Sequence, residues 1–69
     1  MDPMAEIFTY HKPTPDKVPK YEAIRTAALE FARVIEANVP SCADRSAAIR
    51  KLREAVMTAN AAIALEGLV

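Results

Sequence analysis

Five prolines, at positions 3, 13, 15, 19 and 40, decide which parts of this 69-residue chain can be helical. Proline lacks a backbone donor and pushes the preceding residue toward extended geometry, so residues 9–19 cannot form a regular helix. Pro40 likewise ends any helix that begins near Pro19. We therefore expect a single all-α domain over residues 1–69, with an N-terminal arm at 1–19 and helices at 20–38 and 41–66.

Both long segments show the helical period of apolar residues. In residues 20–38 one face is formed by Tyr21, Ile24, Ala28, Phe31 and Ile35. In residues 41–66 a seam spaced three and four apart is formed by Ile49, Leu52, Val56, Ala59 and Ile63. The short connection at Pro40 predicts an antiparallel two-helix hairpin, whose second seam packs against Phe31, Val34 and Ile35.

Polar residues indicate where the helices begin and end. Asp2 followed by Pro3 is a capping pattern, so a short helical turn is expected through about Phe8. Ser41, with an acidic residue three positions on, is the predicted N-cap of the last helix. Gly67 is predicted to follow that helix as its C′ residue.

A chain this short needs stabilisation beyond its own core. The single cysteine, Cys42, cannot form an intrachain disulfide, nor a Cys/His zinc site with His11 alone. We therefore expect a helical homo-oligomer. Its packing face on the last helix would consist of small or adaptable residues: Ala47, Ala48, Ala55, Ala62 and Met57. The alternative is that the alanines only raise helix propensity. Asn60 either fixes the register between subunits or faces solvent.

Nine basic and nine acidic side chains give a formal charge of zero, which argues against duplex nucleic acid or an anionic membrane as partner. No apolar run approaches the roughly 20 residues that span a bilayer, and residues 1–10 lack the pattern of a signal peptide, so a cytosolic protein is expected. Neither a catalytic constellation nor a cofactor site is apparent, so no enzyme is expected. A basic cluster on the last helix could contact phosphates, but we interpret it as a solvated face with some ion pairs between subunits: Arg45, Arg50, Lys51 and Arg53.

Residues 8–25 concentrate side chains that suit a small nucleotide. Tyr10 can stack on a base, and His11 and Lys12 can donate hydrogen bonds. Three further cations can neutralise phosphates: Lys17, Lys20 and Arg25. The prolines reduce the entropy lost when this arm is ordered. The alternative is structural, with the aromatic residues clamping the arm onto the hairpin: Phe8, Tyr10 and Tyr21.

The motifs FTYH at 8–11, YEAIR at 21–25 and EAVMTANAAIA at 54–64 resemble the phage anti-CBASS family of cyclic-nucleotide sponges. The resemblance covers about residues 8–64, with the elements in the family's order. It implies a small helical homohexamer that binds cyclic dinucleotides such as cyclic GMP-AMP, and in some members cyclic trinucleotides, without cleaving them. The CBASS immune effectors in the host bacterial cytoplasm are thereby deprived of their signal.

Carried over by position, the family's stacking tyrosine falls on Tyr10 and its phosphate-binding cation on Arg25. The implied ligand-binding set, in a site shared by two subunits, is Tyr10, His11, Lys12, Arg25 and Thr26. Family members often have tryptophan at Thr58 and arginine at Leu65, and the second departure puts a separate trinucleotide pocket in question. The alternative functions are a helical protein-binding adaptor without a nucleotide ligand and, more distantly, a small nucleic-acid-binding regulator.

Overall fold

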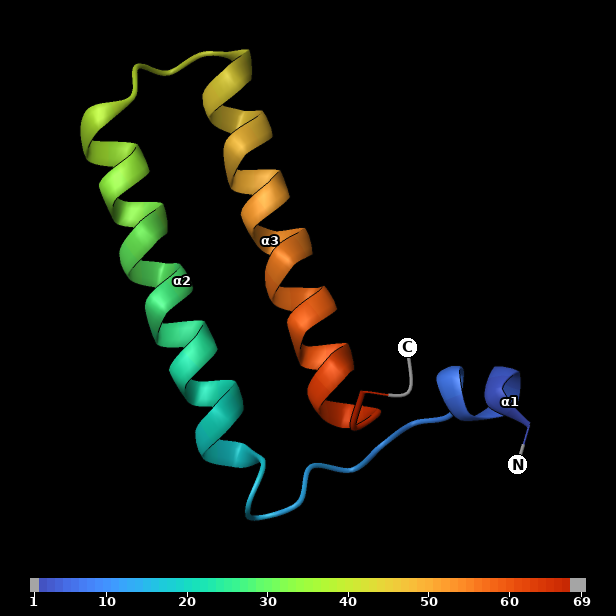
Figure 1. Ribbon diagram of the computed structural model, residues 1–69. Coiled ribbons are helices and arrows are strands. Elements are labelled where there is room, and N and C mark those ends of the chain that lie inside the picture. Colours follow the sequence, from blue (N-terminus) through green and yellow to red (C-terminus); the bar gives the residue numbers. More distant parts are fainter. Residues whose placement is uncertain (1, 68–69) are drawn as a thin grey trace.

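The computed structural model describes residues 2–67, which form three α-helices and, within that range, no β-strand. Helix α1 spans Pro3–Ile7, α2 spans Val18–Asn38 and α3 spans Ala43–Ala64. Helices α2 and α3 lie side by side and antiparallel, whereas α1 lies apart from them, to the side of the open end of the hairpin (Figure 1). The predicted all-helical class and the hairpin are confirmed.

Helices α1 and α2 follow the capping and proline rules. The Asp2 carboxylate accepts a hydrogen bond from the Met4 N–H at 3.0 Å, as its predicted capping role requires. Helix α2 begins at Val18, two residues before the expected position. Pro19 then occupies the first turn, where no N–H is needed for the helical ladder. The helix ends at Asn38, as predicted from Pro40.

The predicted cap of α3 is wrong. Helix α3 begins at Ala43, and its N-cap is Cys42 rather than Ser41. The backbone of Cys42 is fully extended, with φ −163° and ψ 175°. Because the extended connection continues through Cys42, the helix starts one residue later than the serine pattern indicated. Cys42 is exposed at this end of the hairpin.

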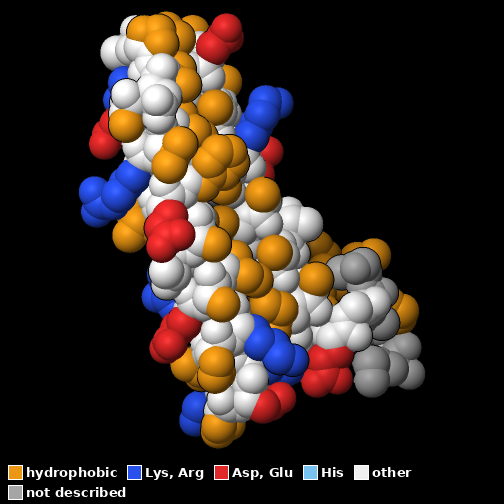
Figure 2. Space-filling model, turned by 60° about the vertical axis from the view of Figure 1, so that its left-hand side comes forward, with side chains coloured by type: hydrophobic (Ala, Val, Ile, Leu, Met, Phe, Trp, Pro, Cys, Tyr) orange, Lys and Arg blue, Asp and Glu red, His pale blue; other side chains and the backbone are white. Residues whose placement is uncertain are grey.

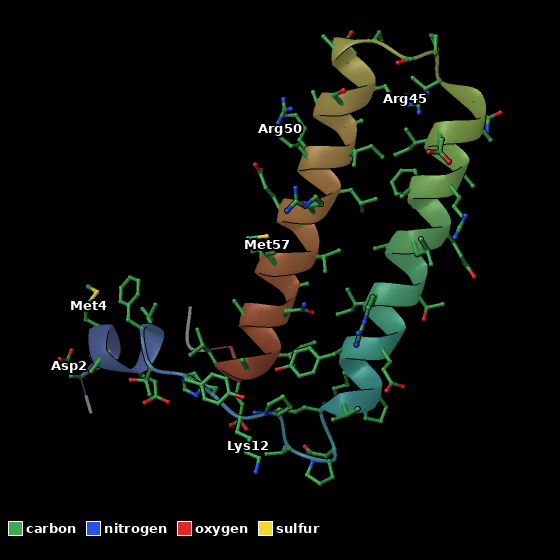
Figure 3. The ribbon with its side chains drawn as sticks, turned by 180° about the vertical axis from the view of Figure 1, so that it is seen from behind. Asp2, Met4, Lys12, Arg45, Arg50 and Met57 are labelled. Carbon is green, nitrogen blue, oxygen red and sulfur yellow. The ribbon has the colours of Figure 1, made fainter. Side chains whose placement is uncertain are left out.

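Arg45 holds the connection between α2 and α3. Its guanidinium donates a hydrogen bond to the Val39 carbonyl at 3.3 Å and lies 3.8 Å from the Glu36 carboxylate. Figure 3 shows Arg45 at the closed end of the hairpin, between the two helices. Arg45 is half-buried, so it does not belong to a solvated face with the other basic residues of α3.

Helix α3 ends in a Schellman arrangement. The Glu66 N–H donates to the Ile63 carbonyl at 3.3 Å, and the Gly67 N–H donates to the Ala62 carbonyl at 3.0 Å. Glu66, with φ 52°, is therefore the left-handed C′ residue and Gly67 is the next one. The prediction of Gly67 as C′ is wrong by one position.

The interface between α2 and α3 is thin. Among residues 2–67, Ile35 alone is buried, with 9% of its surface exposed. Phe31 and Val34 each remain 56% exposed, so only one of the three residues expected to cover the seam does so fully. The predicted seam residues of α3 are half-buried: Ile49, Leu52, Val56, Ala59 and Ile63.

The molecule is elongated, with extents of 47 × 24 × 15 Å. Its radius of gyration is 14.9 Å, against about 11 Å for a compact chain of this length. Its accessible surface is 5482 Å², against about 4,250 Å² for a compact monomer of 7.5 kDa. Apolar side chains gather along the line between the two long helices (Figure 2). In residues 2–67 no helix is long and apolar enough to cross a membrane.

Candidate ligand-binding groove

A groove of about 690 Å³ lies between the arm and the open end of the hairpin. We call it the arm groove. Its walls come from three segments of the chain: Tyr10, His11 and Pro13 of the arm, Tyr21 and Arg25 of α2, and Val56, Met57, Asn60, Ala61 and Ala64 of α3. Its volume falls within the range of about 300–1,000 Å³ that is usual for small-molecule sites.

Two tyrosines supply aromatic rings from different elements. Tyr10 belongs to the arm and is 82% exposed, so its ring is accessible to a ligand. Tyr21 belongs to the first turns of α2 and is half-buried. Nucleobases stack on such rings with little dependence on base identity. The groove therefore has two candidate stacking surfaces, of which only Tyr10 was predicted.

Arg25 lies one helical turn after Tyr21, so both side chains project from the same side of α2. Arg25 is exposed, and no carboxylate within residues 2–67 forms a salt bridge with it. An arginine without an internal anion is available for a phosphate, which it can contact with two parallel N–H groups. The groove thus combines a cation with aromatic rings.

His11 joins the arm to α1. Its Nε2 lies 2.7 Å from the Glu6 carbonyl oxygen, so Nε2–H donates to that carbonyl. The Glu6 carboxylate is 3.8 Å from the same nitrogen. This geometry occupies Nε2 and leaves Nδ1 and the ring face for the groove. His11 therefore positions the arm as well as lining the site.

Lys12 and Thr26 do not line the arm groove. Lys12 is exposed and points away from the hairpin (Figure 3). Thr26 is exposed on α2 and is rotated by about 100° around the helix axis from Arg25. Lys17, considered as a phosphate contact, instead forms an ion pair with Glu66 at 3.1 Å, and its side chain is only 15% exposed. Of the predicted site, the structure brings Tyr10, His11 and Arg25 together.

Two apolar grooves adjoin the arm groove. One shares Arg25, Val56 and Met57 with it and continues along the hairpin past Ala28, Leu29, Ile49, Leu52 and Arg53. The other, which we call the reverse groove, is formed by residues offset around both helices: Ile24, Ala27, Ala28, Phe31, Leu52, Ala55, Val56 and Ala59. Ala55 and Met57 were expected on one packing face but line different grooves, so they lie on different sides of α3. The packing of these residues against another subunit stays a prediction.

Seven of the ten residues that line the arm groove were not assigned to the site from the sequence, among them Tyr21, Met57 and Asn60. The helical spacing from Arg25 could have indicated Tyr21. Met57 and Asn60 depend on how α3 is rotated against α2, which the periodic pattern of either helix alone does not determine. Across residues 2–67 no three His, Cys, Asp or Glu side chains gather in a way that could hold a metal ion.

The fold and the groove define a small α-helical hairpin domain with a ligand-sized, aromatic-walled surface site. A family model of the Acb2/Tad1 hairpin domain matches residues 3–64. The chain therefore belongs to the Acb2/Tad1 hairpin family, which is the anti-CBASS sponge family, and the predicted resemblance is confirmed. No curated protein and no solved structure matched the chain.

Proposed function

We propose that this protein binds and sequesters cyclic oligonucleotide second messengers, in particular cyclic dinucleotides such as cyclic GMP-AMP, and so blocks CBASS immunity. The observation that carries the proposal is that Tyr10 and Arg25, from separate segments, line one groove. Membership in the sponge family supports the same class of ligand. The protein acts in the cytoplasm of the host bacterium, where these messengers are made.

The groove suits the two parts of a nucleotide. The Tyr10 ring stacks on a base, which on aromatic platforms contributes about 1–3 kcal/mol per base. The Arg25 guanidinium contacts a phosphate through charge-assisted hydrogen bonds. Neither Lys12 nor Thr26 lines the arm groove of its own chain. Their contact with the ligand stays a prediction.

A second subunit completes the site in this proposal. A cyclic dinucleotide has two bases and two phosphates in a near-twofold arrangement, so two protomers can each offer one Tyr10 and one Arg25. The exposed position of Tyr10, at 82%, leaves its ring accessible from a neighbouring copy. Two grooves that meet across a twofold axis would enclose a ligand that one open groove only touches.

The surface area supports assembly. The chain exposes about 1,200 Å² more than a compact monomer of its mass. A standard interface buries about 800 Å² per partner, so each subunit has excess surface for more than one contact. The reverse groove, with Phe31 more than half exposed, is a surface that another copy can cover. Contacts on two sides of each subunit are what a closed hexamer requires.

The proposed action is capture without turnover. The arm groove offers two tyrosine rings, the His11 imidazole, a guanidinium and an amide, and in this proposal these groups bind a cyclic nucleotide without attacking it. To test this, purified protein is mixed with cyclic GMP-AMP, the complex is isolated and heated, and the released nucleotide is analysed. Intact ligand in stoichiometric amount is expected. Linear or hydrolysed product that increases with protein concentration would contradict the proposal.

A thermal-shift panel of cyclic dinucleotides and trinucleotides distinguishes the sponge from the alternative, a protein-binding adaptor. A ligand at 100 times its Kd adds roughly 2.7 kcal/mol of stability per independent site, which appears as a higher melting temperature. An adaptor without a nucleotide ligand would show no shift with any member of the panel. A shift with trinucleotides alone would place the site elsewhere.

A further inference from the structure

Asn60, which lines the arm groove, carries a side-chain acceptor without a hydrogen-bond partner in the described part of the chain. Its Oδ1 atom is buried, and no donor among residues 2–67 hydrogen bonds to it. A buried carbonyl oxygen without a partner costs free energy, so native structures rarely retain one. A donor that arrives with a ligand would satisfy such an atom at a proposed ligand site.

The surroundings of Asn60 explain why its own chain does not satisfy it. Its neighbours along the α3 wall of the groove are apolar: Val56, Met57, Ala61 and Ala64. Tyr21 and Arg25 bring donors to the same groove from α2, yet neither hydrogen bonds to Oδ1. The amide is therefore a single polar group within an apolar wall, opposite aromatic and cationic side chains.

We propose that Asn60 is a specificity-determining residue, which accepts a hydrogen bond from the exocyclic amino group of an adenine held in the arm groove. This inference rests on the proposed function and deepens it. Stacking on Tyr10 or Tyr21 does not select among bases, because every base has a π face. An asparagine amide does select, since its adjacent acceptor and donor match N6 and N7 of adenine.

The same amide disfavours other purines on that edge. Guanine presents two acceptors there, O6 and N7, so the amide can contact it only through Nδ2 and the Oδ1 atom stays unpaired. Hypoxanthine also carries an oxygen at position 6. The Oδ1 atom lies below the groove surface, and rotation about the terminal Asn torsion, which is broad and roughly twofold, brings it toward a bound base. The groove therefore prefers a 6-amino purine.

The first test compares two ligands on the unaltered protein. Cyclic di-AMP and cyclic di-IMP differ at position 6 of each base, so calorimetry with both isolates the proposed contact. We expect cyclic di-AMP to bind more tightly by roughly 5- to 150-fold for each base that is contacted in this way. Equal affinity for the two ligands would overturn the role of Asn60 while leaving the proposed function intact. Failure to bind either ligand, with cyclic GMP-AMP still bound, would overturn the role of Asn60 alone, and failure to bind all three ligands would overturn both.

The second test uses Asn60→Leu, which keeps a similar shape and removes both polar atoms. We expect this variant to lose the preference, with the loss of affinity confined to cyclic di-AMP. Persistence of the full preference in Asn60→Leu would overturn the inference. A variant that sediments differently from the parent and loses both ligands equally would show that Asn60 contacts a neighbouring subunit instead, which also overturns it.

Discussion

Lys17 and Glu66 form an ion pair, with Nζ and Oε1 3.1 Å apart, that joins the residue before α2 to the residue after the α3 cap. Arg45 holds the closed end of the hairpin, and this pair holds the open end, beside the arm groove. Glu66 keeps a left-handed backbone, with φ 52°, while making this contact. The side chain of Glu66 therefore stabilises the fold through the ion pair, while its left-handed backbone destabilises it.

We predict that Glu66→Ala and Glu66→Gly separate these effects. Glu66→Ala loses the ion pair but keeps the strained backbone, and should lower the free energy of unfolding by about 0.2–1 kcal/mol, as partly exposed pairs do. Glu66→Gly also loses the pair but has no Cβ, and should be more stable than Glu66→Ala by about 1 kcal/mol. Urea unfolding at one fixed protein concentration measures both. Equal stability of the two variants would show that the left-handed backbone costs nothing here.

Tyr10→Ala should weaken the binding of cyclic GMP-AMP strongly. If two protomers each supply one ring, the variant loses both stacking contacts, about 2–6 kcal/mol, or roughly 30-fold to more than 10,000-fold in Kd. Tyr10→Phe keeps the ring and should bind nearly as tightly as the parent. Phe8→Ala is the matched control, because Phe8 is an aromatic residue of the same segment, 80% exposed, and does not line the arm groove. Equal Kd values for Tyr10→Ala and Phe8→Ala in calorimetry would contradict the assignment.

Arg25→Ala should reduce affinity because each phosphate loses a charge-assisted contact. The expected loss per contact is about 1.5–3 kcal/mol, or roughly 10- to 150-fold in Kd. Arg25→Lys keeps the charge but not the planar fork, and should lie between the parent and Arg25→Ala. Arg50→Ala makes the same chemical change on the outer side of α3, where Figure 3 shows Arg50 projecting away from α2, and should leave Kd unchanged. A loss of the same size in Arg50→Ala would indicate a nonspecific charge effect.

Thr14→Val should change the titration of Asp16. The Thr14 hydroxyl donates to the Asp16 carboxylate at 2.5 Å, and this bond, with a smaller contribution from the backbone of Asp16, lowers the carboxyl pKa below its ordinary value of 3.8. Removing the hydroxyl should raise that pKa toward 3.8, as measured by NMR titration of the carboxyl carbon. Thr9→Val is the control, since the Thr9 hydroxyl donates to the Ala5 carbonyl and not to a carboxylate.

The sign of the stability effect follows from the direction of this shift. Because the folded state binds the Asp16 proton less tightly than the unfolded state, the contribution of Asp16 is fully present above pH 3.8 and is lost as the pH falls through the lowered pKa. The free energy of unfolding should therefore fall less between neutral and strongly acidic pH in Thr14→Val than in the parent. An Asp16 pKa unchanged in Thr14→Val would remove the basis for this effect.

Sedimentation should show an assembly larger than a monomer at micromolar concentration. Phe31→Glu places a charge in the apolar reverse groove and should shift the protein toward smaller species. Ala23→Glu introduces the same side chain at an exposed position of α2 outside the three grooves, and should leave the assembly unchanged. A folded monomer for the parent protein would refute both the hexamer and the shared site.

The prolines and the helical period of apolar residues predicted the all-α fold class and the hairpin. Both features act locally along the chain, so the sequence is enough to interpret them. The end of α2 at Asn38 followed from Pro40 alone. The N-cap at Cys42 and the C′ residue at Glu66 each differ from prediction by one residue, because both depend on backbone angles that side-chain type only biases. The contact between Lys17 and Glu66, and the position of Asn60 in the groove, depend on the rotation of α3 against α2. That rotation is set by packing between distant segments.

Cys42 also gives this protein a natural attachment point for a fluorescent dye. It is exposed and is the single cysteine of the chain, and the connection to which it belongs is at the opposite end of the hairpin from the arm (Figure 1). Val56, which lines the arm groove, lies 14 residues after Cys42, or roughly 21 Å along α3 at the helical rise, so a thiol-linked reporter does not touch the ligand in the groove. Energy transfer between labelled copies would follow subunit exchange and assembly in real time, on protein with an unaltered sequence and an unobstructed site.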